Sequence, residues 1–245
     1  MNYSIQKVAA KALAQEMRME ILANNLANTN TIGFKQDRTA FVIPDMQKEN
    51  ASGAENIKSS RVYGQFYART DFSTGQLKFT GNKLDLALEG KGFFCVQTPD
   101  GIRYTRQGNF VLSQEGVMLT QDGFPVLGRG DRIAVEGKDI AIDRDGSVFV
   151  DGNEVDRLRL VDFSQPYALK KVNNTMFAAN DPSVAGDTAE DVSVCQGFIE
   201  LSNVDSVRMI VEMIETVRGY ESYQKVMQYM DEAVVKTVNE VGRVA

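Results

Sequence analysis

The sequence predicts an α+β fold: long helices at the N- and C-terminal ends pair as an α-helical coiled-coil domain, and the middle of the chain forms a central antiparallel all-β domain. Two observations predict this. Apolar residues recur every three or four positions near both ends, and the middle consists of short apolar runs separated by glycine-containing turns. We therefore expect residues 1–35 with 203–245 to form the helical domain, 36–71 an extended connector, and 72–202 the β domain.

The first helix carries an apolar stripe with alternating spacings of three and four, which is typical of a seam that packs against another helix. Gln15 is its one polar interruption. The stripe consists of Ile5, Val8, Ala12, Met19, Leu22 and Leu26.

The last helix is expected from Ser206 to about Val241, after a segment whose polar side chains can cap its start. Its stripe fades through Glu221 and Gln224 and then resumes one position out of phase. The stripe consists of Val207, Ile210, Ile214 and Val217, then Met227, Met230, Val234, Val238 and Val241. Each end is predicted to need a partner helix; the alternative is a monomer whose end helices form a hairpin on the β domain.

The segment after the first helix is rich in asparagine and is predicted to redirect the chain. Asn24, Asn25, Asn28 and Asn30 can satisfy free backbone groups, and Gly33 permits a left-handed turn. Side chains bonded across an interface and side chains bonded within a tight turn both fit this pattern.

The connector is polar and weakly periodic from about 41 to 61, and alternation over 62–71 is compatible with a strand. From 72 to 195 the dense turn signals, with no helix between them, indicate antiparallel hairpins.

Composition argues against most catalytic and binding classes. The 245 residues have a formal net charge of −6, which disfavours nucleic acid or an anionic membrane as the main partner. Histidine is absent, which removes Ser-His and Cys-His nucleophile pairs and the usual zinc and iron sites. No glycine-rich phosphate loop is present, so we expect no cofactor. Cys95 and Cys195 are expected to be buried, unpaired thiols.

Acidic residues offer two further hypotheses. The stretch from Asp143 to Ser147 could suggest a calcium loop, but Val148 stands where such a loop needs glycine, so an Asp-Gly turn between two strands is expected. A cell-wall carbohydrate-acting enzyme would need two carboxylates at fixed separation. The residues that could be drawn on are Asp100, Asp122, Asp143 and Asp151.

No apolar run approaches the roughly 20 residues that span a bilayer. Charged residues interrupt the N-terminal apolar residues, so a cleaved secretory signal peptide is not expected. The chain is expected to stay in the cytoplasm or to leave it by a route without such a signal.

Three groups of motifs resemble the bacterial flagellar rod and hook proteins. The first spans residues 22–35 and the second 74–94, 104–110 and 126–128, while the third spans 196–204 and continues through 213–226. They occur in the family's order and cover both ends and most of the middle. Length and the tail at 227–243 resemble the proximal rod subgroup most, with the distal rod subgroup, or a short hook-type subunit, as the alternative.

The resemblance implies a structural subunit of the flagellar basal body and no enzyme. Its expected partners are copies of itself, other proximal and distal rod subunits, and the flagellar type III export apparatus. The expected location is the periplasmic rod, reached without a cleaved signal peptide, where the subunits stack into a tube that carries torque from motor to hook.

The residues expected to form the assembly interface come from both terminal stripes and the asparagine-rich turn. They are Ile5, Val8, Ala12, Met19, Leu22, Asn24, Asn25, Leu26, Asn28, Asn30, Gly33, Phe34, Val207, Ile210, Ile214, Val217, Gln224, Val234 and Val238.

Overall fold

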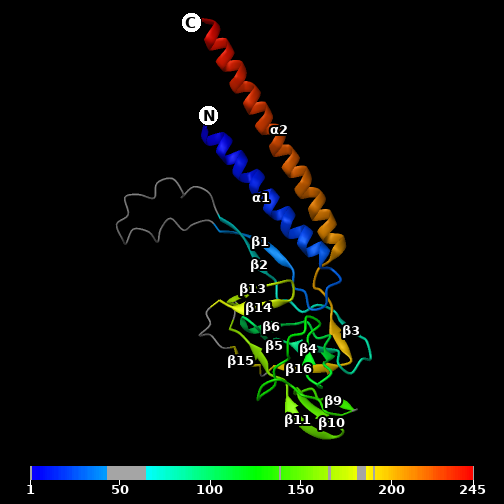
Figure 1. The fold of residues 1–245 in the computed structure, drawn as a ribbon. Helices are drawn as coiled ribbons and strands as arrows, with labels where there is room; N and C mark the ends of the chain where they lie inside the picture. Colours follow the sequence, from blue (N-terminus) through cyan, green and yellow to red (C-terminus); the bar gives the residue numbers. More distant parts are fainter. Residues whose placement is uncertain are drawn as a thin grey trace, which may run out of the picture. The chain divides into compact units, whose positions relative to one another are not determined.

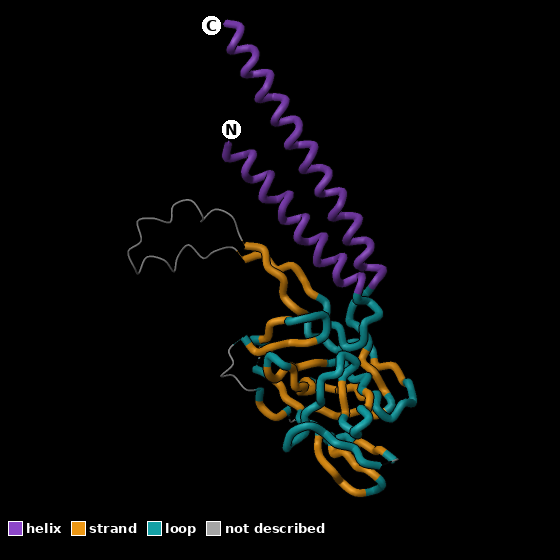
Figure 2. The backbone as a smooth tube through the Cα atoms, in the orientation of Figure 1, coloured by secondary structure: helices purple, strands orange, loops and turns teal. Residues whose placement is uncertain are grey.

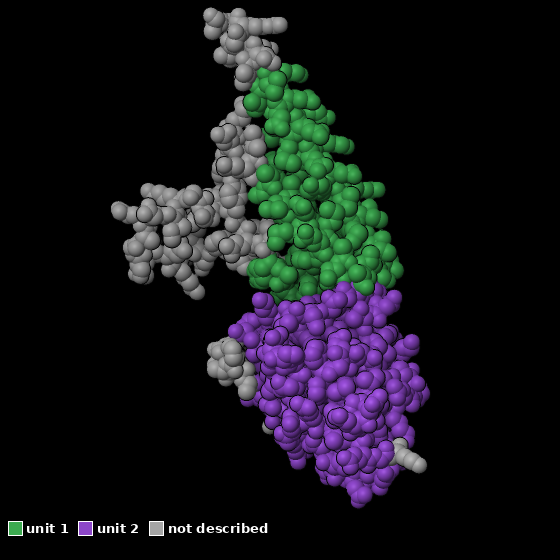
Figure 3. Space-filling view, in the orientation of Figure 1, with its two compact units in different colours: residues 1–27, 37–71, 205–245 green, residues 28–36, 72–204 purple. Residues whose placement is uncertain are grey.

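The structure is a computed structural model that describes residues 2–42, 65–137, 139–164, 167–180, 186–189 and 191–244. The chain divides into two compact units, coloured separately in Figure 3. Unit 1 comprises residues 1–27, 37–71 and 205–245, and unit 2 comprises 28–36 and 72–204. The short segment 28–36 therefore belongs to unit 2, although the chain on both sides of it belongs to unit 1.

Unit 1 contains two helices and a pair of strands. Helices α1 (Asn2–Ala27) and α2 (Ser206–Val244) lie side by side and run in opposite directions (Figures 1 and 2). Arg18 Nη2 and Glu212 Oε2 form an ion pair between them at 3.5 Å. Strands β1 (Asp37–Val42) and β2 (Gln65–Thr70) pair antiparallel, with Asp37 opposite Thr70.

The start of α2 is capped as the sequence indicates. The Asp205 carboxylate accepts hydrogen bonds from the amides of Val207 and Arg208, both at 3.1 Å. These amides have no partner inside the helix, so the cap fixes where α2 begins.

The predicted coiled-coil domain is wrong. In the described part of the chain the only helices are α1 and α2, and no coiled-coil pairing is seen. The first three residues of the predicted α2 stripe are exposed, with Val207 at 72% and Ile214 at 49%, whereas Met209 and Thr216 are buried. Spacing of three and four defines an apolar face, but it does not determine whether that face meets a helix of the same chain.

Unit 2 consists of strands and loops (Figure 2), and its strands pair antiparallel, in agreement with the prediction for the middle of the chain. The largest sheet has six strands in the order β13-β14-β6-β5-β12-β15. Its strands are β5 (Phe93–Thr98), β6 (Gly101–Thr105), β12 (Leu160–Asp162), β13 (Leu169–Lys171), β14 (Met176–Ala179) and β15 (Asp187–Thr188).

Smaller sheets complete unit 2. A three-stranded sheet has the order β11-β10-β9, and three strand pairs are β16-β4, β17-β3 and β7-β8. Their bounds are β3 (Leu77–Phe79), β4 (Leu86–Gly90), β7 (Val111–Leu112), β8 (Met118–Leu119), β9 (Ile140–Ile142), β10 (Ser147–Val150), β11 (Asn153–Arg157), β16 (Val192–Gln196) and β17 (Phe198–Glu200).

Strand β5 explains why part of the middle is continuously apolar. Because successive side chains point to opposite faces of a strand, Phe94 and Val96 join one buried cluster, whereas Phe93 and Cys95 join a second. The strand is therefore covered on both faces, and neither face can be polar.

The predicted connector is described only at its ends. Its first and last parts form β1 and β2, and the polar stretch 43–64 lies outside the described residues. The boundaries 1–35 with 203–245, 36–71 and 72–202 stay a prediction. Neither described helix combines the length and apolar character needed to cross a membrane.

Candidate functional site

Segment 28–36 enters unit 2 through a tight turn at Gly33. The Gly33 amide donates a 2.8 Å hydrogen bond to the carbonyl of Glu200, and its φ is 70°. A Cβ atom at this position would lie 2.4 Å from the amide nitrogen of Gln107. Phe34 follows with its ring fully buried, and Lys171 Nζ lies 4.1 Å from the ring centroid.

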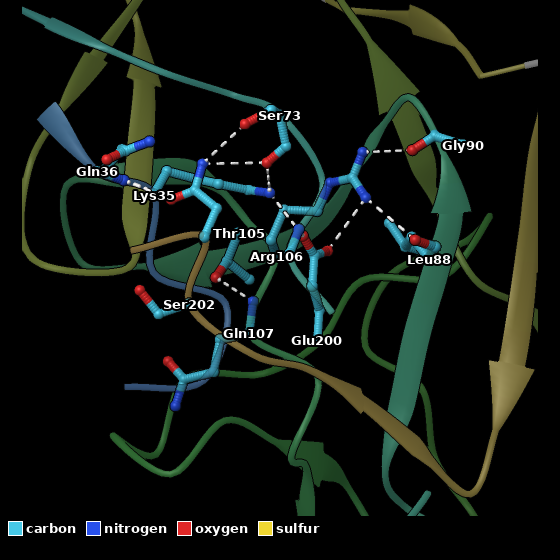
Figure 4. A network of polar contacts seen from close by, with 12 residues as sticks. Lys35, Gln36, Ser73, Leu88, Gly90, Thr105, Arg106, Gln107, Glu200 and Ser202 are labelled. Carbon is cyan, nitrogen blue, oxygen red and sulfur yellow. Dashed lines mark hydrogen bonds and ion pairs between the residues drawn. The ribbon is translucent and has the colours of Figure 1, made fainter. Parts of the chain in front are cut away.

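Next to this turn lies the ionic cluster, which we define as Lys35, Arg106 and Glu200 (Figure 4). Lys35 Nζ lies 2.5 Å from Glu200 Oε1, and Arg106 Nη1 lies 3.3 Å from Glu200 Oε2. All three side chains are at least 96% buried. Two cations therefore share one carboxylate in the interior of unit 2.

Backbone groups also take part in the cluster. Lys35 Nζ also donates to the carbonyl of Ser73 at 2.7 Å, and the Gly75 amide donates to Glu200 Oε1 at 2.8 Å. Arg106 donates to the carbonyls of Leu88 and Gly90 at 3.2 and 2.7 Å. Removing one member of such a cluster leaves a buried charge uncompensated, which typically costs about 3–5 kcal/mol.

Asn203 ties the two ends of unit 2 together. Its Oδ1 accepts from the Gln36 amide at 2.8 Å, and its Nδ2 donates to the carbonyl and hydroxyl of Ser73, both at 3.1 Å. Asn203 thus holds together three of the four places where the chain enters or leaves unit 2, namely those near Gln36, Ser73 and Asn203 itself.

The predicted asparagines differ in their surroundings. Asn25 is 1% exposed, and its side-chain amide exchanges two hydrogen bonds with the backbone of Asp37, at 2.7 and 2.9 Å. Asn28 is buried, and its Oδ1 accepts from the Thr31 hydroxyl at 3.1 Å. Asn24 and Asn30 are exposed. Asn25 and Asn28 therefore support the tight-turn interpretation, and Asn24 and Asn30 lie where an interface could form.

The N-terminal stripe is covered to different degrees. Ala12 and Leu22 are buried, whereas Val8, Met19 and Leu26 are half-buried. Ile5 lies in α1, but its side chain is outside the described ones.

The C-terminal stripe is more open. Val207, Ile210 and Ile214 are exposed, and Val211, which is not part of the predicted stripe, is exposed beside them at 51%. We call these four residues the α2 apolar face. Of the other predicted residues, Val217 and Val234 are half-buried, Gln224 is exposed, and the side chain of Val238 is outside the described ones.

Both thiols are unpaired, as predicted, but only Cys95 is buried. Burial raises the pKa of Cys95 to about 12, since a thiolate is poorly solvated in that environment. Burial and then the charge of Glu89 raise the pKa of Cys195. Neither thiol is activated as a nucleophile.

The acidic residues do not form a metal centre in the described part of the chain. The predicted Asp-Gly turn is confirmed: Gly146 donates to the Asp143 carbonyl at 2.9 Å, between the paired strands β9 and β10. Hydrogen bonds from Ser147, with the backbone amide first, lower the pKa of Asp145. Asp100, Asp122 and Asp151 lie in turns of unit 2.

The ionic cluster is not among the predicted site residues. Lys35, Arg106 and Glu200 lie inside the three groups of motifs, yet nothing in their spacing shows that they meet. The available signal was weak: Glu200 stands between Ile199 and Leu201, where an isolated charge in an apolar strand needs a partner.

Comparisons with known proteins match the three groups separately. Residues 7–35 match a family described as "Flagella basal body rod protein". Residues 87–150 match the "Flagellar hook protein FlgE/F/G D1 domain", and 196–240 match the "Flagellar basal body rod FlgEFG protein C-terminal". Each match contains one member of the ionic cluster.

Full-length relatives agree. The chain is 32% identical to the flagellar basal-body rod protein FlgG of Bacillus subtilis, covering 91% of this chain and 93% of the relative. It is 32% identical to FlgF of Caulobacter vibrioides, covering 96% of each, and 30% identical to FlgF of Rhizobium meliloti, covering 99% of each. The chain therefore belongs to the flagellar basal-body rod protein family, a structural and non-enzymatic family of motility proteins, and is a structural subunit of the flagellar basal body.

Proposed function

We propose that this subunit polymerises through its terminal helices into the periplasm-crossing rod, which transmits torque from motor to hook. Assembly with other rod subunits follows from the family. The route of assembly, the periplasmic location and the torque-bearing role go further and are the proposal.

The observation that carries the proposal is the α2 apolar face. Its four side chains are 46–72% exposed on consecutive turns of one helix. Apolar residues grouped in this way on an otherwise charged helix favour contact with another protein. Repeated head-to-tail contacts that do not close into a ring give a filament, so a single subunit can build a tube.

The interface would draw on the predicted residues of both helices and the turn. From α2 these are Val207, Ile210, Ile214, Val217, Gln224, Val234 and Val238, and from α1 and the turn they are Ile5, Val8, Ala12, Met19, Leu22, Asn24, Asn25, Leu26, Asn28, Asn30, Gly33 and Phe34. Of the described side chains, Ala12, Leu22, Asn25, Asn28 and Phe34 are buried within the chain, so they would support the interface rather than line it.

The proposed partners are copies of this subunit and neighbouring proximal and distal rod proteins. Delivery would use the flagellar type III export apparatus, without a cleaved signal peptide. We place the chain with the proximal rod subgroup; similar identities to FlgG and FlgF relatives leave a distal rod subunit as the second candidate.

The proposal is tested by Ile210→Glu, which puts a charge on the α2 apolar face. Because Ile210 is exposed at 46%, the variant in dilute solution should have the same free energy of unfolding as the unchanged chain. When the Ile210→Glu variant is expressed in a bacterium that lacks its own copy of this subunit, motility should not be restored. The variant should also be absent from basal bodies purified from that bacterium.

Val155→Glu is the matched control. Val155 is 47% exposed and lies on β11 in unit 2, so the same charge at nearly the same exposure should leave incorporation intact. Normal incorporation of Ile210→Glu would contradict the proposal, as would equal loss with both variants.

A further inference from the structure

Helix α1 carries an exposed apolar surface outside the predicted stripe. Leu13 is 58% exposed and Met17 is 36% exposed, and Ala9, four residues before Leu13, is exposed as well. Residues spaced by four lie along one side of a helix and form a ridge. We call Ala9, Leu13 and Met17 the α1 outer ridge. It leaves one side of α1 open to contact with another protein.

The α1 outer ridge fits the α2 apolar face in length and in shape. Each spans about two helical turns, on the order of 10 Å along its axis. The α2 apolar face contains two rows of residues spaced by four, Val207 with Val211 and Ile210 with Ile214. Because ridges of one helix pack into the grooves of another, the α1 outer ridge can enter the groove between these two rows.

The charges beside the two surfaces have opposite signs. The only charged residues three or four positions from the α1 outer ridge, and thus on its side of the helix, are Glu16 and Glu20. By the same criterion the α2 apolar face is bordered by Arg208, Glu215 and Arg218. All five are exposed, and Arg208 stays 67% exposed although it also pairs with a carboxylate of its own helix. The net charges are therefore complementary, which fixes the register of a contact more than it adds affinity.

Both surfaces are exposed in the same chain, so neither covers the other within one copy. We propose that the α2 apolar face of one copy packs against the α1 outer ridge of a second copy. Every copy supplies both complementary surfaces, and a contact between unlike surfaces repeats from copy to copy without pairing them off. This inference rests on the proposed function and names the surface that the α2 apolar face meets.

The experiment is disulfide formation in purified basal bodies that contain two variants, Leu13→Cys and Ile210→Cys, expressed together. Each variant has a single new cysteine, so a dimer requires two copies. Two cysteines form a disulfide only where their Cα atoms lie within about 7 Å. Treatment with a thiol oxidant should therefore give at least roughly tenfold more dimer from the pair than from either variant alone.

Lys11→Cys is the matched control for Leu13→Cys. Lys11 is also exposed on α1, but it lies two residues from Leu13 and thus on a different side of the helix. Together with Ile210→Cys it should give no more dimer than the unchanged chain, in which Cys95 and Cys195 set the background.

A charge exchange tests the same contact without new cysteines. Leu13→Lys combined with Ile210→Glu in one chain places opposite charges on the two surfaces. The amount of this subunit in basal bodies should then rise at least several-fold above that of Ile210→Glu alone. This measurement decides the question if a cysteine variant does not enter basal bodies, and a failure to recover would then overturn the inference.

Two other outcomes would also overturn it. One is as much dimer from Ile210→Cys alone as from the pair, because the α2 apolar faces of two copies would then meet each other. The other is no dimer from the pair although both variants are present in basal bodies, which would assign the α2 apolar face to a different partner. In both cases the proposed function stands as long as Ile210→Glu prevents incorporation, whereas normal incorporation of Ile210→Glu would contradict the proposed function itself.

Discussion

Gly33 is the residue at which a missing side chain permits the contact between segment 28–36 and the rest of unit 2. Its backbone adopts a left-handed conformation and approaches the backbone of Arg106 and Gln107 too closely for a Cβ atom. Other residue types would be strained at this φ, and any side chain would push the neighbouring backbone aside.

Gly33→Ala should therefore destabilise the protein by about 3 kcal/mol, from backbone strain together with steric overlap. Gly123→Ala is the matched comparison, because Gly123 has φ 83° and nothing within 4 Å of the added Cβ. It should cost only about 1 kcal/mol. Denaturant unfolding of both variants measures the difference, and equal losses would show that the close approach at Gly33 is unimportant.

Cys95 makes stability depend on pH in the alkaline range. Its pKa is about 12 in the folded protein against an ordinary value of 9.0, so the folded state retains the proton longer than the unfolded state. The contribution of this group to the free energy of unfolding is fully present below pH 9 and is lost as the pH rises toward 12.

Because of this one group, the free energy of unfolding at pH 10.5 should be about 2 kcal/mol lower than at pH 8. Replacing the thiol by Cys95→Ala should lower stability at pH 8, because a buried side chain is truncated, but should flatten the decline between pH 8 and 10.5. Urea unfolding at the two pH values checks this. An unchanged slope in the variant would assign the alkaline decline to other groups.

At the scale of the element, α2 begins where Asp205 supplies the missing acceptor. Asp205→Ala should cost about 1 kcal/mol and increase amide exchange in the first turn of α2. Ser222→Ala is the control: its hydroxyl donates to the Arg218 carbonyl within the helix, and alanine is a good helix former, so no loss is expected. If the Val207 amide exchanged at the same rate in the unchanged chain, Asp205→Ala and Ser222→Ala, the cap would not be needed to stabilise the first turn of α2.

Both faces of β5 are covered, whereas α2 keeps an apolar face uncovered. The difference follows from what each element can meet inside the chain. Strands of unit 2 lie between two apolar clusters, while α2 has α1 beside it and buries Met209 and Thr216 but few large apolar groups.

At the scale of the whole molecule, the two units should differ in protection. The described side chains of α1 and α2 that are buried and apolar are Ala12, Ala14, Leu22 and Met209, whereas unit 2 contains both apolar clusters. In the dilute chain, amides of 2–27 and 206–244 should exchange faster than those of 28–36, which we expect to behave as part of unit 2.

Peptide-resolved exchange measures this directly. Similar protection of the helices and of β5 would mean that the ends are stable without assembly. Exchange of 28–36 at the rate of α1 would contradict the division of the chain and would weaken the role given to the ionic cluster.

The family, the terminal helices and the antiparallel middle could be predicted from the sequence alone, because periodicity, turn residues and the three groups of motifs are local signals. The cap at Asp205 and the turn at Asp143 were also readable, since each involves neighbours in the chain. The folded structure was needed to show that Lys35, Arg106 and Glu200 meet, that 28–36 belongs with the strands, and that the α2 apolar face remains exposed. Those facts depend on contacts between residues far apart in sequence, and a single chain's spacing does not encode which distant charge or face becomes the partner.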